Sequence, residues 1–408
     1  MRRNPGLFVA ISLVSGFGSS AMSLVSGIWI LDLTGSSGLA ALAQLCVYAP
    51  VLAGPWLGGV LDRAPRRPLI IGVNLALAAA LSALFAVRGP SDAWLIFAVS
   101  FAYGVSYVLI DAGETALLPS ALSAAELADV NGWRSSAQEG MKLVAPLAGA
   151  GLYAWRGAHP VVAISALMPV LVAGLYATLR LAQQPPAPPV ERRHDLRAGL
   201  AAVFERPAIR VPVLLAAVSI SMSGFATAGF YAVVTRELNL PATFLGVLVS
   251  AQGLGSILGG LIVGRLITRR GATAIAVAGT VLFAAGCLGR CLPWWPGTVA
   301  ASVVAGVGLP WALVAAVTTI QTHTPAELLG RISGTANTVM FGPIALAIPL
   351  GAAAVQLGSA TPLIAAAAFC LTAAAVAARR PIPPEREERD GSSGDPVVPP
   401  ATVTGGHP

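Results

Sequence analysis

Acidic side chains inside long apolar segments are the residues of this chain with the most distinctive chemistry. Asp111 and Glu114 lie one helical turn apart in an apolar segment, residues 93–117. A carboxylate at the centre of a membrane helix costs about 2.5–3.5 kcal/mol, and like charges one turn apart oppose each other's ionisation. We therefore interpret both residues as candidates for taking up and releasing a proton. The alternative is a hydrated helix end or a pair with a nearby arginine.

Two more acidic residues are candidates for the same chemistry. Asp32 lies at the end of the first apolar segment, where a capping or interface role is the alternative. Glu139 is three residues from Lys142, so the two side chains can neutralise each other on one helix face. A structural pair is therefore the alternative to a proton relay for Glu139.

Polar residues also repeat at helical spacing in three apolar segments, which places each set on one helix face. The sets are Ser12, Ser15, Ser19, Ser23 and Ser26; Ser100, Tyr103, Tyr107, Asp111 and Glu114; and Ser219, Ser223, Thr227 and Tyr231. A single serine can satisfy itself on its own backbone, but three stripes together favour the lining of a polar cavity. A fourth segment has no stripe. There Gly306-x-Gly308-Leu-Pro310 precedes Trp311, and we expect a bend that presents Trp311 to the cavity.

The composition shows what kind of element must position these side chains. The chain is 56% hydrophobic and only 11% charged, with a mean hydropathy of +0.76, whereas soluble domains carry about 25% charged residues. Lipid is therefore the main solvent, and a nucleic-acid partner is excluded despite the net charge of +7. Twelve stretches have the length of a membrane-spanning helix: 7–31, 38–60, 69–88, 93–117, 134–155, 160–181, 211–234, 243–267, 273–292, 297–320, 333–357 and 361–378.

The arginine distribution predicts the orientation of these helices. With the N terminus in the cytoplasm, only four basic residues, Arg88, Arg156, Arg236 and Arg290, fall on the outer side, which agrees with the bias of short cytoplasmic loops. Arg290 is expected to extend from its helix end to the membrane surface. Both termini are then cytoplasmic. The 24 arginines against one lysine, with abundant Ala and Gly, suggest a GC-rich bacterium and its cell membrane.

The chain divides into four regions. We predict an all-α membrane protein with two pseudo-symmetric six-helix bundles, residues 1–182 and 211–380, joined by a cytoplasmic loop, 183–210, and followed by a disordered tail, 381–408. Gly58-x3-Asp62-Arg63 recurs as Gly264-x3-Thr268-Arg269, each after the second helix of its half. Internal repeats of this kind are typical of secondary transporters, whose substrate site lies between the repeats.

The stretch Gly58-Gly-Val-Leu-Asp62-Arg63-Ala-Pro65-Arg66-Arg67 resembles the signature loop of the major facilitator superfamily, with Pro65 in place of a glycine. The resemblance covers residues 5–380 and extends to the branch of enterobactin-type and macrolide exporters. It implies a loop that latches the two halves in the outward-facing state; the alternative is a simple topology determinant. The residues of this loop and its repeat are Gly58, Asp62, Arg63, Arg66, Arg67, Gly264 and Arg269.

The fifth apolar segment carries Ala145-Pro146-x2-Gly149, which resembles the antiporter motif of the same family in degraded form. The proline is expected to kink the helix, and the small residues permit close packing; generic small-residue packing is the alternative.

The resemblance and the polar stripes together imply a secondary transporter rather than an enzyme. We expect it to export a drug-like or siderophore-like small molecule as a monomer, in exchange for protons and without cofactor or metal. No Gly-x4-Gly-Lys-Ser/Thr loop occurs in the sequence, so ATP hydrolysis by this chain is not the expected energy source. An importer or facilitator on the same fold and a non-transporting membrane sensor remain as alternatives.

Overall fold

The computed structural model describes residues 3–53, 65–179, 204–324 and 326–379, and these residues form helices and short connections without a β-strand. The described residues of each of the twelve predicted segments are mainly helical, and residues 54–60 of the second segment lie outside the described part. The first half contains α1 (Arg3–Thr34), α2 (Ser37–Tyr48), α4 (Arg66–Ala83), α5 (Ala93–Ala121), α6 (Ala124–Arg156) and α7 (Ala158–Thr178). The second half contains α9 (Pro207–Ala232), α10 (Leu245–Arg270), α11 (Ala272–Gly289), α12 (Trp295–His323), α13 (Ala326–Phe341), α14 (Ile344–Ala354) and α15 (Thr361–Ala378).

Within this described part, ten helical stretches are long and apolar enough to cross a membrane. The two other predicted segments are α6, whose first half is charged, and α2, which continues as a 3₁₀ turn to Ala53 and is shorter. The eleventh predicted segment is divided into α13 and α14 by a turn at Gly342 and Pro343. Proline has no backbone N–H to donate, which explains a break at this point. Residues 183–203 of the predicted loop and the tail lie outside the described residues.

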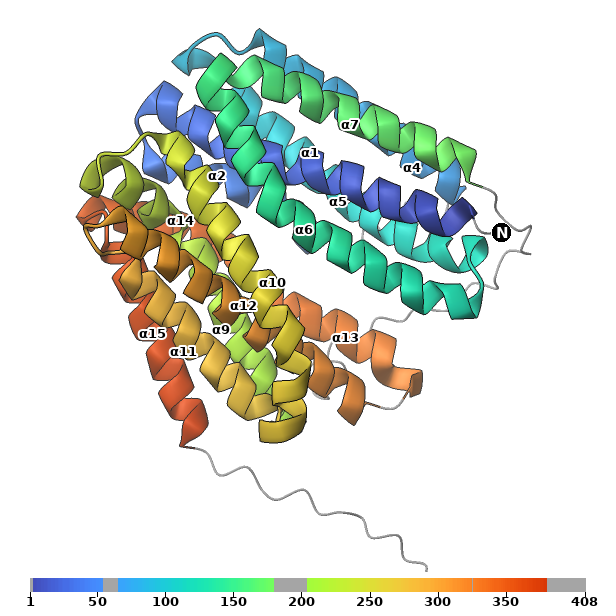
Figure 1. Cartoon of the computed structure of the whole chain (residues 1–408), viewed down its shortest axis with the longest axis vertical. Helices are drawn as coiled ribbons and strands as arrows, with labels where there is room; N and C mark the ends of the chain where they lie inside the picture. Colours follow the sequence, from blue (N-terminus) through green and yellow to red (C-terminus); the bar gives the residue numbers. More distant parts are fainter. Residues whose placement is uncertain (1–2, 54–64, 180–203, 325, 380–408) are drawn as a thin grey trace, which may run out of the picture.

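We call the face where α1 begins and α15 ends the inner face, and the opposite face the outer face. The two halves converge toward the outer face and diverge toward the inner face (Figure 1). Contacts between the halves join α6 to α10 and α2 to α14. A hydrophobic core near the outer face includes residues of both halves, among them Ile28, Trp29, Tyr231 and Leu245. The molecule is therefore closed on its outer side, and its inner helix ends are apart.

The glycines and the proline of α12 lie inside one helix, which runs without interruption from Trp295 to His323 through Pro310. Its glycines serve packing, because a Cβ on Gly306 would overlap the carbonyl oxygen of Gln252 in α10, and one on Gly308 would overlap the backbone of Phe283 in α11. The sequence signal that suggested a bend marks a helix packed closely on two sides.

Candidate functional site

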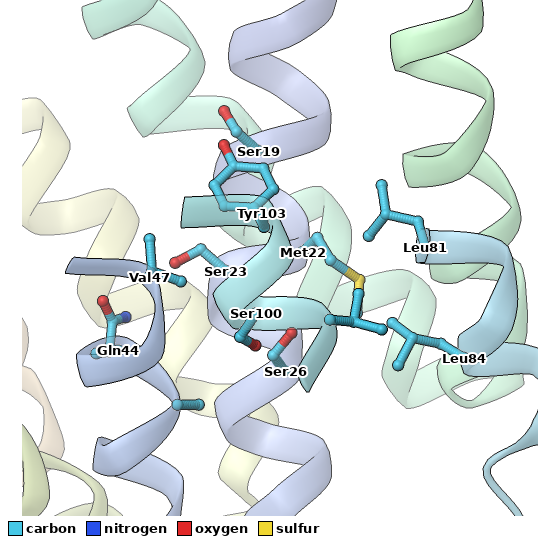
Figure 2. A pocket seen from close by; sticks show the side chains of 12 residues that line it. Ser19, Met22, Ser23, Ser26, Gln44, Val47, Leu81, Leu84, Ser100 and Tyr103 are labelled. Carbon is cyan, nitrogen blue, oxygen red and sulfur yellow. The ribbon is translucent and has the colours of Figure 1, made fainter. Parts of the chain in front are cut away.

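The polar stripes of α1 and α5 meet at a small pocket in the first half (Figure 2). Gly104 positions α5 there, since a Cβ at this residue would overlap the carbonyl oxygen of Val47 in α2. The polar lining residues are Ser19, Ser23 and Ser26 of α1, Gln44 of α2, and Ser100 and Tyr103 of α5. The predicted cavity residues Ser19, Ser23 and Tyr103 therefore come together around one space. Gln44 was missed, although it is a polar residue in an otherwise apolar helix.

Several polar groups of this pocket are available to a ligand. In the described part of the chain, the side chains of Ser23, Ser26, Gln44 and Ser100 have no hydrogen-bond partner. The Tyr103 hydroxyl lies beside Ser19 (Figure 2). The free volume is about 20 Å³, which holds a water molecule or two. The pocket is thus a polar slot too narrow for an organic molecule in this conformation.

The third stripe and Trp311 do not reach this pocket. Ser223 and Thr227 of α9 donate hydrogen bonds to backbone oxygens of their own helix, while Tyr231 is buried against Gly27 of α1. The Trp311 Nε1 donates to the Gly259 carbonyl oxygen of α10 at 3.0 Å. Trp311 is therefore held against α10 within the second half, and its role in the substrate cavity stays a prediction.

Below the pocket, toward the inner face, the α5 stripe ends in a buried ion pair. The Glu114 Oε2 lies 2.6 Å from Arg134 Nη2 of α6, and the two side chains are 9% and 13% exposed. Arg134 Nε also donates to the Ser12 hydroxyl of α1 at 3.3 Å. The Tyr176 hydroxyl of α7 is buried near the same carboxylate without a hydrogen bond to it, and Glu114 Oε1 has no partner among the described residues. Side chains of four helices thus meet in one polar cluster, and the arginine-pairing alternative for Glu114 is the one found.

Asp111 lies on the same stripe but has different surroundings. The residue is exposed, and within the described residues its carboxylate has no ion pair or hydrogen bond. Tyr107, one turn away, is 54% exposed. The stripe therefore presents an accessible, unpaired carboxylate next to an accessible aromatic ring, between the pocket and the Glu114–Arg134 pair.

The other two acidic candidates, Asp32 and Glu139, each contact a neighbouring helix. Asp32 is exposed near the outer face and accepts a hydrogen bond from the Tyr153 hydroxyl of α6 at 2.8 Å. Glu139 pairs with Lys142 at 2.6 Å, as its spacing predicted, and its second oxygen accepts from Ser256 of α10 at 3.2 Å. Glu139 therefore contributes to the contact between the two halves.

The predicted latch is described only in part. Gly58, Asp62 and Arg63 lie outside the described residues. Arg66 is exposed, and Arg67 donates to the carbonyl oxygen of Ala177 at the end of α7, in its own half. In the repeat, Gly264 has no atom within 4 Å of an added Cβ, and Arg269 is exposed. The role of this loop remains a prediction.

The motif of α6 lies where the halves touch near the outer face. Ala145 is fully buried, and Gly149 packs on Ala21 of α1. A Cβ added to Gly246 of α10 would lie 3.0 Å from the Pro146 carbonyl oxygen and 2.5 Å from the Ala150 methyl carbon. The small residues therefore allow α6 to approach both α1 and α10 closely.

Arg290 contradicts the expectation that it reaches the membrane surface. Arg290 is only 4% exposed to solvent. Nη2 donates to Gln252 Oε1 at 2.6 Å, Nε donates to the Ser302 hydroxyl at 3.1 Å, and the guanidinium lies 4.3 Å above the Phe230 ring. Neutral acceptors on α10 and α12 and an aromatic face hold the charge inside the second half, which the position of Arg290 at a helix end did not indicate.

The amino-acid sequence matches one known protein family. A family model described as Major Facilitator Superfamily matches residues 7–234 and residues 213–405. Macrolide efflux protein A of Streptococcus pyogenes is 26% identical over 175 residues, and this match spans 42% of the present chain and only 42% of that protein.

Solved structures of transporters share the fold. The nucleoside transporter NupG is 13% identical, with a TM-score of 0.68 over 92% of this chain and 98% of that chain. A bacterial homologue of the iron transporter ferroportin in an inward-facing state is 15% identical, with a TM-score of 0.65 over 93% and 100%. A D-xylose–proton symporter is 11% identical, with a TM-score of 0.70 over 91% and 97%. At these identities the likeness concerns the fold alone.

Proposed function

The chain belongs to the major facilitator superfamily, and from that premise we propose that it exports an amphipathic, cationic small molecule in exchange for protons. The proposal depends on one observation: the Asp111 residue on the polar stripe of α5 is exposed, and its carboxylate has no partner among the residues that the structure describes. An importer on the same fold remains the main alternative.

Asp111 is suited to bind either a proton or a cation. A carboxylate without a partner has a high free energy in a membrane helix, and protonation or a bound cation lowers it. The exposed ring of Tyr107 one turn away can also attract a cation through its face. Since proton and substrate would use one carboxylate, binding of one would favour release of the other, which is the thermodynamic requirement of exchange.

Glu114 has a different role in this proposal. Its Oε2 pairs with Arg134 at 2.6 Å, and this neighbouring positive charge favours the ionised form of the carboxylate. Arg134 is also close enough to interact electrostatically with Asp111. We therefore assign proton exchange to Asp111 and the positioning of Arg134 to Glu114.

One comparison supports an outward direction of transport, the partial match to macrolide efflux protein A. When one monovalent cation leaves for each proton that enters, no net charge crosses the membrane, so the pH difference supplies the energy, about 1.4 kcal/mol per pH unit.

The test is transport into inverted membrane vesicles. With ethidium, a fluorescent lipophilic cation, and a macrolide as probes, the wild-type protein should accumulate substrate only while a proton gradient is present. Asp111→Asn keeps the size of the side chain but cannot ionise, and we expect roughly a tenfold loss of gradient-driven accumulation, the effect of about 1.4 kcal/mol.

Asp129→Asn is the matched control, because Asp129 is an exposed carboxylate of α6 near the inner face. It should transport like the wild type. Unchanged transport by Asp111→Asn would refute the assignment of this residue, and accumulation in right-side-out vesicles instead would show an importer.

A further inference from the structure

A groove runs along the outside of the second half between α9 and α15, which pack against each other. Its volume is about 350 Å³. Leu214 of α9 and Phe369 and Val376 of α15 are 39%, 56% and 50% exposed along its sides. These side chains lie on a surface that faces lipid in a membrane protein of this fold.

Small residues create the groove. Ala373 and Ala377 of α15, four residues apart, leave space that larger side chains would fill. The floor includes Leu215 of α9, which is 3% exposed and packs with Ala276 of α11 and Ala315 of α12. The floor thus belongs to a packed core, so the hollow is part of the folded bundle and not a gap between loose helices.

The walls of the groove offer no free polar group. Thr372 lines the groove, but its hydroxyl donates to the Ala368 carbonyl oxygen of its own helix at 2.8 Å. All other lining residues except Arg210 are aliphatic or aromatic. The groove therefore suits a hydrocarbon chain.

Arg210 supplies a single positive charge at the inner end of this hydrocarbon groove. Its Nη1 makes one long hydrogen bond of 3.4 Å to the Phe204 carbonyl oxygen, and its buried Nε has no partner. No carboxylate among the described residues lies within 4.0 Å of the guanidinium. A guanidinium with unused donors suits phosphate oxygens, which can accept two parallel hydrogen bonds from it.

The length of the groove fits one half of a bilayer. Arg210 and Val218 are eight residues apart on α9, which corresponds to about 12 Å along a helix. One leaflet of the hydrocarbon core is about 15 Å thick. We propose that the groove binds an acyl chain of an anionic phospholipid from the inner leaflet, with its phosphate on Arg210.

The charge of Arg210 selects an anionic lipid over a neutral one, since the net charge of a zwitterionic headgroup is zero and its own cation competes for the phosphate. A free anion would contact Arg210 but leave the apolar walls unoccupied. The site is separate from the proposed transport pathway, because its residues lie on α9 and α15 of the second half and the polar stripes that form the pocket lie on α1 and α5.

Photo-crosslinking of the purified full chain tests this site. Phosphatidylglycerol and phosphatidylcholine that carry the same photoactivatable acyl chain are bound to the protein, and labelled peptides are mapped by mass spectrometry. In the wild-type protein, phosphatidylglycerol should label residues 210–218 and 369–377 more strongly than phosphatidylcholine. Arg210→Gln should reduce this labelling roughly fivefold, the factor for one arginine at an anionic surface, and leave phosphatidylcholine unchanged.

Two other variants complete the test. Ala373→Trp fills the groove and should abolish labelling by both lipids, with Leu214→Trp as a second filling variant if the first fails to fold. Arg270→Gln removes an exposed arginine from the inner end of α10 and should label like the wild type. Equal labelling by both lipids, no effect of Arg210→Gln, or full competition by inorganic phosphate would each overturn the proposal.

Discussion

Replacing Glu114 by glutamine is expected to lower the free energy of unfolding by about 3–5 kcal/mol. The substitution leaves the charge of Arg134 buried with only Ser12 at 3.3 Å and Asn131 at 3.4 Å as neutral acceptors. These bonds do not compensate for the loss of a carboxylate 2.6 Å away. The four helices that meet at this cluster would all be affected. Thermal unfolding of the purified protein in detergent measures the effect, with an expected decrease in Tm of roughly 5 °C.

The exposed pair in the neighbouring part of α6 is a matched control. Glu139→Gln breaks the Lys142–Glu139 pair, whose side chains are 57% and 35% exposed, and should cost no more than about 1 kcal/mol. The double variant Glu114→Gln with Arg134→Gln removes both buried charges and should recover most of the lost stability. Equal effects of Glu114→Gln and Glu139→Gln would contradict a buried ion pair at Glu114.

Gly246→Val is expected to shift the protein from the outer-closed state toward an outer-open state. A Cβ on Gly246 would lie 2.5 Å from the Ala150 methyl and 3.0 Å from the Pro146 carbonyl oxygen of α6. Neither neighbour can rotate away, so the overlap costs about 2–3 kcal/mol and is relieved when the halves separate. An energy of this size changes the ratio of the two states about a hundredfold.

Spin labels on the outer ends of the two halves measure this shift. Arg156 of the first half and Glu237 of the second are exposed near the outer face. Each is replaced by cysteine to carry a spin label, in a protein whose four native cysteines are replaced by alanine. The distance distribution should move to longer values in Gly246→Val. Gly260→Val is the control, because a Cβ at Gly260 of the same helix meets no atom within 4 Å. Identical distributions for both valine variants would show that the α6–α10 contact does not decide the state.

Much of the fold could be predicted from the amino-acid order. Spanning segments are recognised from the hydropathy of about 20 consecutive residues, and ten of the twelve proposed segments correspond to stretches of the described chain that are long and apolar enough to cross a membrane. The limits of this reasoning appear at α6 and α13. Charges such as Glu139 and Lys142 make α6 less apolar than a typical span, and the proline after Gly342 divides the eleventh segment.

The sequence predicted those parts of the candidate site that consist of residues on one face of a single helix. Helical spacing placed Ser19 and Ser23 on one face of α1 and Ser100 and Tyr103 on one face of α5, because residues three and four apart share a face. Spacing does not show which way that face turns. It therefore did not reveal that Tyr231 packs against Gly27, that Trp311 bonds to α10, or that Gln44 joins the pocket.

By itself, the sequence determined that the chain consists of apolar helices of membrane-spanning length, and that a polar stripe with two carboxylates lies on the fourth apolar segment. These properties are local, since they depend on residues within one helix length. Only the tertiary structure decided that Glu114 is paired while Asp111 has no partner among the described residues, that Arg290 is buried, and that Arg210 lies at the end of an apolar groove. Each of these depends on the rotation and spacing of neighbouring helices, which residues far apart in the chain set jointly through packing.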